Sequence, residues 1–182
     1  MKQSWQKIRR AFYDGQLLAY PTEAVWGLGC DPFNEGAVRR LQAVKNRSAG
    51  KGLILVAGAW AQLDPVLAHL SEDEKKPLYD TWPGPVTWLI PRPPAIPQWI
   101  VGQYDTVAVR LSTHPGVIEL TQALGSMVVS TSANHSGKSP ARNALQVRRW
   151  FGSDVPVIIP GPLGGQLKPS RIFDLRTGEQ LR

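Results

Sequence analysis

Residues 45–56 read KNRSAGKGLILV, and this stretch shapes the first expectations about the fold. Its last four residues, Leu53 to Val56, are apolar without interruption, which is typical of a strand buried on both faces. Three cations precede them within seven residues, namely Lys45, Arg47 and Lys51. Cations neutralise phosphates and carboxylates, and Arg binds them through two parallel hydrogen bonds. The stretch therefore predicts a buried strand beside a site for an anionic small molecule.

A second stretch of the same kind spans residues 127–134, which read MVVSTSAN. Its apolar part predicts another buried strand, and Ser130 to Asn134 place hydroxyl and amide side chains at the strand end. Open α/β sheets bind the polar parts of their ligands at such strand ends. Together with the cations at 45–51, these residues predict a nucleotide site.

Helical and strand patterns alternate along the rest of the chain. Residues 71–74 match a capping box, and Pro115 and Gly125 mark the two ends of another helix. We expect helices at 4–14, 34–45, 71 onward, 115–124 and 143–151, and strands at 17–20, 53–57, 86–90, 106–110, 127–130 and 155–159, then a hairpin of 171–175 with 179–182. Residues 22–29 read as a turn and a glycine-containing loop. The alternation predicts an α/β fold with helices on both faces of the sheet.

Length and charge narrow the class of protein. The chain has 182 residues, of which 42% are hydrophobic, and we expect residues 1–182 to form a single domain with a sizeable core. The formal net charge of +7 favours phosphorylated partners such as a nucleotide or an RNA. The positive charges are scattered, which argues against a disordered basic tail.

Targeting signals and disulfides are not expected. Met1 to Trp5 are not followed by the apolar stretch of a signal peptide, and no apolar run approaches the roughly 18 residues of a membrane helix. Cys30 is the only cysteine, so no intramolecular disulfide can form, and we expect it to be a small core residue. These features predict a cytoplasmic protein without a membrane partner.

Several common catalytic and metal-binding patterns are absent. The chain has no C-x-x-C, H-E-x-x-H, Walker A, G-x-G-x-x-G or G-x-S-x-G motif, and its three histidines are far apart in sequence. A structural zinc site is therefore not expected. The cations at 45–51 also suit an exposed helix end, where a substitution usually changes stability by only about half a kcal/mol. Residues 82–87 (WPGPVT) are expected to be a structural turn.

Taken in order, these motifs resemble those of the YrdC family, over Leu17 to Arg182. The resemblance rests on YPTEA at 20–24, K-x-R at 45–47 with Lys51, WPGPVT at 82–87, AVR at 108–110 and STSANHSG at 130–137. Each motif alone is weak, but the ordered set is specific. The chain is most similar to the short bacterial members, the threonylcarbamoyl-AMP synthases.

The resemblance implies a fold and a reaction. The fold is a single α/β domain with a twisted, mixed β-sheet flanked by helices and a basic concave cavity. The reaction joins L-threonine, bicarbonate or CO₂, and ATP into threonylcarbamoyl-AMP and pyrophosphate. Downstream threonylcarbamoyl transferase proteins then modify tRNAs that read ANN codons. ATP is a substrate that brings Mg²⁺, and no tightly bound organic cofactor is implied.

The resemblance also implies roles for individual residues. Catalysis is assigned to Lys45 and Arg47, ATP binding to Arg47, Lys51, Thr106, Ser132, Asn134 and Arg182, and threonine binding to Thr22, Arg110 and Ser130, with no protein ligand to a metal. One departure concerns residues 51–53, which read KGL where many members have Asn-Pro-Leu and a following histidine. Val56 stands at the place of that histidine, so the histidine contact to threonine is absent here.

Two other functions remain open at this point. A basic protein of this size also suits a non-catalytic module that binds double-stranded RNA or tRNA, and threonine-dependent release of pyrophosphate separates the two. Related modules also form carbamoyl adenylates from other amines, usually within longer chains. The amino acid that supports adenylate formation distinguishes that second alternative.

Overall fold

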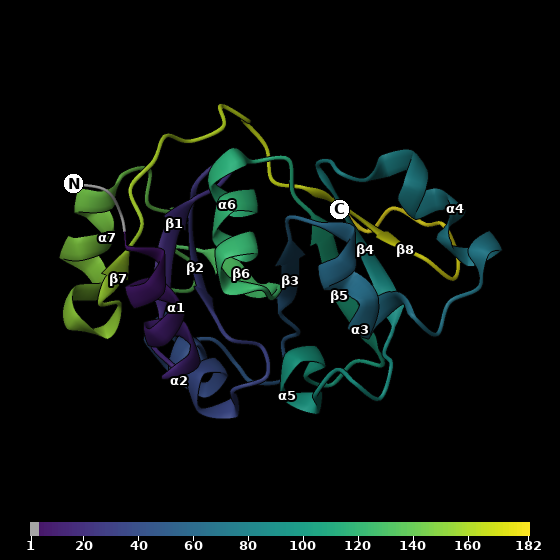
Figure 1. Cartoon of the computed structure of the whole chain (residues 1–182), viewed down its shortest axis with the longest axis horizontal. Helices are drawn as coiled ribbons and strands as arrows, with labels where there is room; N and C mark the ends of the chain where they lie inside the picture. Colours follow the sequence, from purple (N-terminus) through teal and green to yellow (C-terminus); the bar gives the residue numbers. More distant parts are fainter. Residues whose placement is uncertain (1–3) are drawn as a thin grey trace.

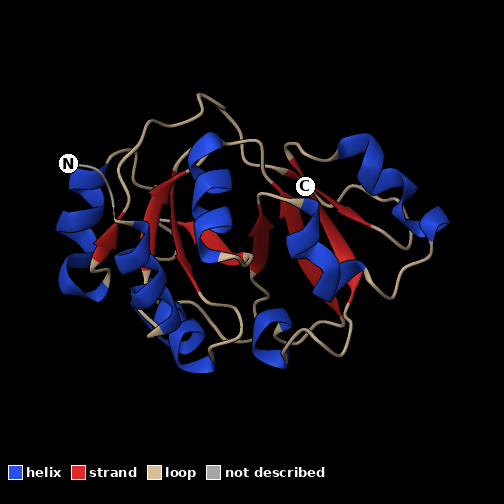
Figure 2. Cartoon of the chain, in the orientation of Figure 1, coloured by secondary structure: helices blue, strands red, loops and turns tan. Residues whose placement is uncertain are grey.

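The computed structural model describes residues 4–182, so Met1 to Gln3, the start of the segment expected to carry no signal peptide, lie outside it. Helices and strands alternate around one central sheet (Figures 1 and 2). The strands are β1 Leu18–Pro21, β2 Trp26–Cys30, β3 Ile54–Ala57, β4 Val86–Pro91, β5 Thr106–Leu111, β6 Val128–Ser132, β7 Val157–Ile158 and β8 Arg171–Asp174. The helices are α1 Trp5–Tyr13, α2 Glu35–Lys45, α3 Asp64–Leu67, α4 Glu72–Thr81, α5 Gln98–Val101, α6 Pro115–Leu124 and α7 Ala144–Phe151, with short 3₁₀ turns at Trp60–Leu63 and Gly152–Asp154. The predicted α/β class is confirmed.

The longer helices begin and end where the local sequence predicts. The side chain of Asn34 caps α2 by accepting a hydrogen bond from the Ala37 amide at 3.0 Å. Ser71 and Glu74 form the predicted capping box of α4. Gly125 ends α6 in the left-handed conformation, with φ of 70°. The short helices α3 and α5 were not predicted, because four residues give too little periodicity to detect.

The eight strands form one mixed sheet in the order β7-β1-β2-β6-β3-β5-β4-β8. The central strand β3 pairs parallel with β5 and antiparallel with β6. Consequently the two stretches singled out in the sequence, 45–56 and 127–134, overlap two neighbouring strands, β3 and β6.

The prediction of a turn and loop at residues 22–29 is wrong from Trp26 onward, because β2 is a fully buried strand between β1 and β6. Its glycines obscured the strand pattern. A Cβ on Gly29 would lie 2.6 Å from the carbonyl oxygen of Val129 and 2.9 Å from the Tyr20 ring. Glycine stands there because the Tyr20 side chain and the β6 backbone fill the space that a side chain would need.

Two apolar layers cover the two faces of the sheet. Helices α1 and α6 pack together on one face, over residues such as Leu18 and Val128 (Figure 1). Helix α2, helix α7 and the segments around α3 to α5 contribute to the larger core on the other face. Cys30 is fully buried in that core, and burial raises the pKa of its thiol, so the prediction of a structural cysteine is confirmed.

The last part of the chain links the two edges of the sheet. Strand β7, shorter than the predicted 155–159, lies at one edge, and β8 lies at the other. We call residues 160–170, which join them, the crossing segment; it passes over the sheet as the yellow-green trace at the top of Figure 1. The backbone of 179–182 turns back onto β8, in partial agreement with the predicted hairpin. Within residues 4–182, no helix combines the length and apolarity needed to cross a bilayer.

Candidate active site

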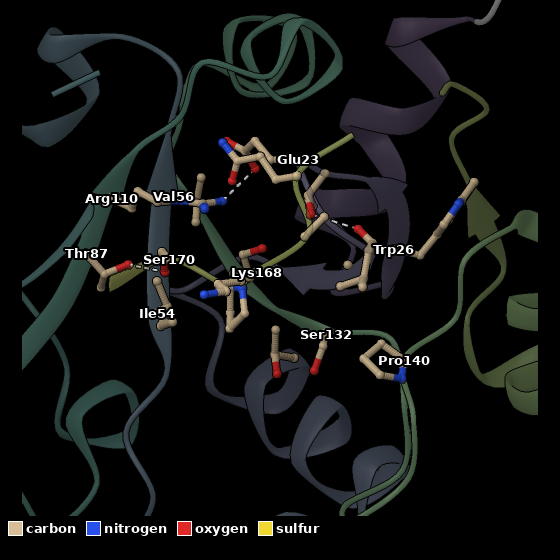
Figure 3. Close-up of a pocket in the computed structure, with 18 of the residues that line it drawn as sticks. Glu23, Trp26, Ile54, Val56, Thr87, Arg110, Ser132, Pro140, Lys168 and Ser170 are labelled. Atoms are coloured by element: carbon tan, nitrogen blue, oxygen red, sulfur yellow. Dashed lines mark hydrogen bonds and ion pairs between the residues drawn. The ribbon is translucent and has the colours of Figure 1, made fainter. Parts of the chain in front are cut away.

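A cavity of about 460 Å³ opens on the sheet beside the ends of the central strands. The floor of the cavity is one face of the sheet. Ile54 pairs with Ser130 and Val56 pairs with Arg110, so the register of the strands places these side chains in rows on that face. The loop after β1, the loop after β6 and the crossing segment complete the lining. Figure 3 shows side chains from all these segments around one space.

The cavity is strongly basic. Five cations lie among its lining residues, namely Arg47, Arg110, Arg142, Lys168 and Arg182. Against them stands a single carboxylate, that of Glu23. A concave surface with this excess of positive charge attracts anions such as a nucleotide and an amino-acid carboxylate.

Arg110 and Glu23 form a buried ion pair at one side of the cavity (Figure 3). Nη2 of Arg110 donates to Oε2 of Glu23 at 2.9 Å, and the Ser112 hydroxyl donates to Oε1 at 2.7 Å. Burial tends to raise the pKa of Glu23, but the charge of Arg110 and the hydrogen bond from Ser112 outweigh it, so this pKa lies below its usual value. Glu23 is therefore ionised at neutral pH.

Thr22 and Ser130 lie close to this pair in the lining. The Thr22 hydroxyl donates to the carbonyl oxygen of Val25 at 2.7 Å, which closes the turn between β1 and β2. Toward a ligand, the Thr22 oxygen is consequently an acceptor. Ser130 is nearly buried at the floor, in the row of Ile54.

The end of α2 directs Arg47 into the cavity. Asn46 has a φ of 52° and ends the helix in the left-handed conformation, after which the chain reverses. Nη2 of Arg47 donates to the Gly52 carbonyl at 2.6 Å, while its buried Nε has no partner within residues 4–182. The guanidinium is thus fixed at one end and retains donors for a ligand.

The expectation that Lys45 is exposed at a helix end is wrong. Lys45 is 3% exposed, and its ammonium donates to the carbonyl oxygens of Ser132 and of Asn134, the second at 2.7 Å. Its own carbonyl accepts from the Ser136 amide at 2.9 Å. The wrong expectation arose because α2 looks solvated at its end, whereas the loop after β6 folds over it. Lys45 is not among the cavity-lining residues.

Ser132 and Asn134 are joined inside the loop that Lys45 holds. The Ser132 hydroxyl donates to Oδ1 of Asn134 at 2.6 Å, and the Asn134 amide nitrogen donates to two loop carbonyls, those of His135 and Lys138. Ser132 lines the cavity, whereas Asn134 does not. The amide of Asn134 therefore shapes the loop and orients Ser132.

The structure brings together six of the ten residues named from the sequence. The six that line the cavity are Thr22, Arg47, Arg110, Ser130, Ser132 and Arg182. Arg182 reaches it from the chain end, with its guanidinium donating to the Ser170 carbonyl at 3.1 and 3.2 Å. Lys51 is exposed, and Thr106 lies on the same face of β5 as Arg110 but outside the lining.

Three charged residues of the site received no role from the sequence. Glu23 belongs to the YPTEA motif, but its position at a strand end does not reveal its partner on β5. Arg142 and Lys168 lie on the loop after β6 and on the crossing segment, where no periodicity indicates direction. Their contribution to the cavity depends on how these loops fold back over the sheet.

A family model and the relatives of known name point to the same family. The family model described as Telomere recombination, which covers Sua5, YciO and YrdC proteins, matches residues 10–182. A protein of Pseudomonas fluorescens (strain Pf0-1) named threonylcarbamoyl-AMP synthase is 48% identical over 184 residues, which cover 100% of this chain and 99% of that protein. A protein of the same name from Cellvibrio japonicus (strain Ueda107) is 48% identical over 168 residues, covering 92% of this chain and 89% of the relative.

Solved structures agree with this assignment. The structure of P. abyssi Sua5 complexed with L-threonine superposes with a TM-score of 0.86 at 32% identity, covering 99% of this chain and 54% of that one. This chain therefore spans about half the length of that Sua5 protein. E. coli YciO, at 21% identity and a TM-score of 0.79 over 93% of this chain and 82% of its own, supports the fold alone. The predicted family is confirmed: this chain belongs to the Sua5, YciO and YrdC family.

Proposed function

We propose that this protein is a threonylcarbamoyl-AMP synthase, which condenses L-threonine, bicarbonate or CO₂, and ATP into threonylcarbamoyl-AMP and pyrophosphate. The observation that carries the proposal is a basic cavity in which one buried Arg–Glu pair lies beside cations that form no ion pair within residues 4–182. The names of relatives that match nearly the whole chain support the activity, and the threonine complex of Sua5 supports the amino acid.

The amino acid is assigned to the side of the cavity around Arg110. In this proposal Arg110 binds the threonine carboxylate, and the hydroxyls of Thr22 and Ser130 contact the rest of the molecule. The Thr22 oxygen acts as an acceptor because its proton is engaged with Val25. Val56 lines the same cavity and has no hydrogen-bonding group where many members of the family have a histidine. In this proposal the polar contacts to threonine therefore come from the hydroxyls of Thr22 and Ser130.

The nucleotide is assigned to the remaining cations. Arg47 and Arg182 bind its phosphates, and Ser132 contacts the nucleoside from the loop after β6. Arg142 and Lys168, which line the same space, add positive charge for the pyrophosphate that leaves. Lys51 and Thr106 remain proposed nucleotide contacts at the margin, and Mg²⁺ arrives with ATP.

Lys45 is given a different role from the one the family resemblance implies. Its ammonium is committed to two backbone carbonyls of the loop after β6. We therefore assign Lys45 to positioning Ser132 and its loop beside Arg47. Asn134, whose amide is engaged within that loop, acts in the same indirect way.

The arrangement suits chemistry in which positioning and charge supply most of the rate. The threonine ammonium first releases a proton to solvent, and the resulting amine adds to CO₂ and loses a second proton to give a carbamate. A carbamate oxygen then attacks the α-phosphorus of ATP, and the bond to pyrophosphate breaks. Both reactants are anions, so the surrounding cations offset their repulsion and stabilise the charge that builds up on the phosphoryl oxygens. A strong general base is not needed for the attack of an anionic carbamate.

The cellular setting is part of the proposal. The enzyme acts in the cytoplasm as a single YrdC-like domain, and its product passes to downstream threonylcarbamoyl transferase proteins that modify adenosine 37 of tRNAs reading ANN codons. Any contact of this protein with RNA is weak and made through phosphates.

The decisive assay supplies ATP, bicarbonate and threonine and detects threonylcarbamoyl-AMP by mass. We expect the adenylate and pyrophosphate to appear only when threonine is present. Arg110→Ala should lose most of the threonine-dependent adenylate synthesis, whereas Arg10→Ala, an exposed change on α1, should retain it. Formation of an adenylate from a different amine would redirect the proposal to another carbamoyl adenylate. RNA binding without any pyrophosphate release would favour the non-catalytic module.

A further inference from the structure

Glu23 is the one carboxylate among the lining residues of a cavity that holds five cations. It is 4% exposed, and its Oε2 lies 2.9 Å from Nη2 of Arg110. A site that only had to bind anions would gain nothing from a fixed negative charge, because that charge repels them. Glu23 therefore calls for an explanation beyond general charge attraction.

Both members of the pair keep hydrogen-bonding capacity. A carboxylate accepts at about four positions, and within residues 4–182 Glu23 accepts from two side chains, those of Arg110 and Ser112. Ser112 is itself held, since its oxygen accepts from the His114 amide at 3.1 Å. Within residues 4–182, Arg110 donates one hydrogen bond, the one to Glu23, and its buried Nε has no partner there. The pair thus presents free acceptors and free donors side by side.

A free amino acid carries the matching arrangement. Its ammonium and carboxylate are attached to the same carbon, so a cation and an anion in contact can bind both groups at once. Resting on the proposed function, we propose that Glu23 binds the α-ammonium of threonine while Arg110 binds the α-carboxylate. Glu23 is then a specificity-determining residue that selects amino acids over carboxylates without an amine.

The neighbouring backbone supports this placement. The Gln166 amide donates to the Glu23 carbonyl at 2.8 Å, and the Gly164 amide donates to the Thr22 carbonyl at 3.0 Å. The crossing segment thereby holds the backbone of Glu23 from above, while Ser112 and Arg110 hold its side chain from β5 and the residues that follow it. A carboxylate fixed from both sides is preorganised to receive an ammonium.

A purely structural role makes a different prediction. If Glu23 only orients Arg110, then its loss weakens every ligand that carries a carboxylate by the same factor. If Glu23 binds the ammonium, its loss weakens threonine selectively. The two roles separate when threonine is compared with (R)-3-hydroxybutanoate, which is threonine without its amino group.

The experiment measures the affinity of both ligands by calorimetry for the wild type, for Glu23→Gln and for Glu119→Gln. Glutamine preserves the size and can still accept from Arg110, while its amide group can donate to the Ser112 oxygen in place of the bond that Ser112 now donates, so the negative charge is removed with both contacts kept. Glu119 provides the matched control, because it lies exposed on α6 and its contact to Trp5 survives the same change. We expect the wild type and Glu119→Gln to prefer threonine by roughly 10-fold or more, and Glu23→Gln to lose about 10-fold of that preference.

The outcomes are distinct. If the wild type binds no threonine, the proposed function fails. If the wild type binds threonine and Glu23→Gln keeps the same ratio of affinities, or loses affinity for both ligands equally, the role of Glu23 is overturned and the proposed function stands. Should Glu23→Gln not fold, Glu23→Asp retains the charge and must retain the preference. Equal affinity of the wild type for both ligands overturns the inference without any variant.

Discussion

At the scale of single residues, burial decides what a charged side chain does. Lys45 and Arg47 are two positions apart and look equivalent in the sequence. The structure places Lys45 under the loop after β6, with its ammonium on two carbonyl oxygens, and places Arg47 at the cavity. Of these two cations, Lys45 therefore supports the site and Arg47 is available to a ligand.

The first prediction concerns the stability that Lys45 provides. Lys45→Met should lower the free energy of unfolding by about 1–3 kcal/mol, because the partly buried carbonyls of Ser132 and Asn134 lose their donor. Urea unfolding monitored by tryptophan fluorescence measures the change. Lys51→Met, an exposed cation six residues later, should change it by no more than about 0.5 kcal/mol. Equal effects of the two substitutions would contradict the buried role.

The same comparison has a pH dependence. Burial and the nearby charge of Arg47 lower the pKa of Lys45 from 10.5 to about 8. Between these values the unfolded chain binds more protons than the folded protein, so wild-type stability rises with pH relative to Lys45→Met. The difference should be constant below pH 8, change between about pH 8 and 10.5 and then level off. A difference that does not vary across this window would show that the pKa is not lowered.

The second prediction concerns the side chain of the amino-acid substrate. Valine lacks the hydroxyl of threonine, and a site built to bind a hydroxyl rejects such an analogue by roughly 10⁴-fold. Serine lacks only a methyl group, which costs roughly 10- to 200-fold. Steady-state kcat/KM values for the three amino acids test this order. Similar values for valine and threonine would show that Thr22 and Ser130 do not recognise a hydroxyl.

At the scale of elements, the crossing segment connects the site to the edges of the sheet. The Pro162 carbonyl contacts Nε2 of His114 at 3.1 Å, and the Ser170 hydroxyl lies 2.9 Å from that of Thr87. Between these anchors the segment passes close to the loop after β1. Its path therefore sets the position of Lys168 and the backbone support of Glu23.

The third prediction tests this support at Gly164. A Cβ at this position would lie 2.9 Å from Cα and 3.2 Å from the carbonyl oxygen of Glu23. Gly164→Ala must displace backbone, and the KM for threonine should rise by roughly 10- to 100-fold because the site loses its alignment. Gly165→Asn is the control, since it has no atom within 4 Å and asparagine tolerates its φ of 79°. An unchanged KM in Gly164→Ala would separate the segment from threonine binding.

At the scale of the whole molecule, the charge of +7 is divided between the cavity and the outer surface. Arg39 and Arg40 on α2 and Arg148 and Arg149 on α7 are all exposed and do not line the cavity. Figure 1 shows α2 and α7 toward the end of the molecule away from β4 and β8. Surface charge of this kind acts on phosphates without regard to base sequence.

The fourth prediction separates RNA contact from catalysis. Replacing Arg39, Arg40, Arg148 and Arg149 by glutamine should weaken RNA retention and spare the synthesis of threonylcarbamoyl-AMP. RNA affinity of the wild type should fall with salt, with a log–log slope of roughly one unit per phosphate contacted. Filter binding over a salt series and the adenylate assay measure the two activities. Joint loss of both would show that these arginines shape the cavity, and salt-insensitive or sequence-selective binding would favour a dedicated RNA module.

The sequence by itself determined the α/β class, most helices and strands, the family resemblance and the stretches that carry the site. These follow from local physics, because capping residues, apolar runs and helical spacing act between near neighbours. Strand β2 was not predicted, because its glycines are required by the Tyr20 ring and the β6 backbone, which lie far away in the sequence or give no local pattern. Only the tertiary structure decided that Lys45 is buried, that Glu23 meets Arg110 and that Lys168 reaches the cavity. The contacts of Lys45 and of Glu23 join segments 87 to 89 residues apart in the chain, and all three outcomes are set by strand order and packing.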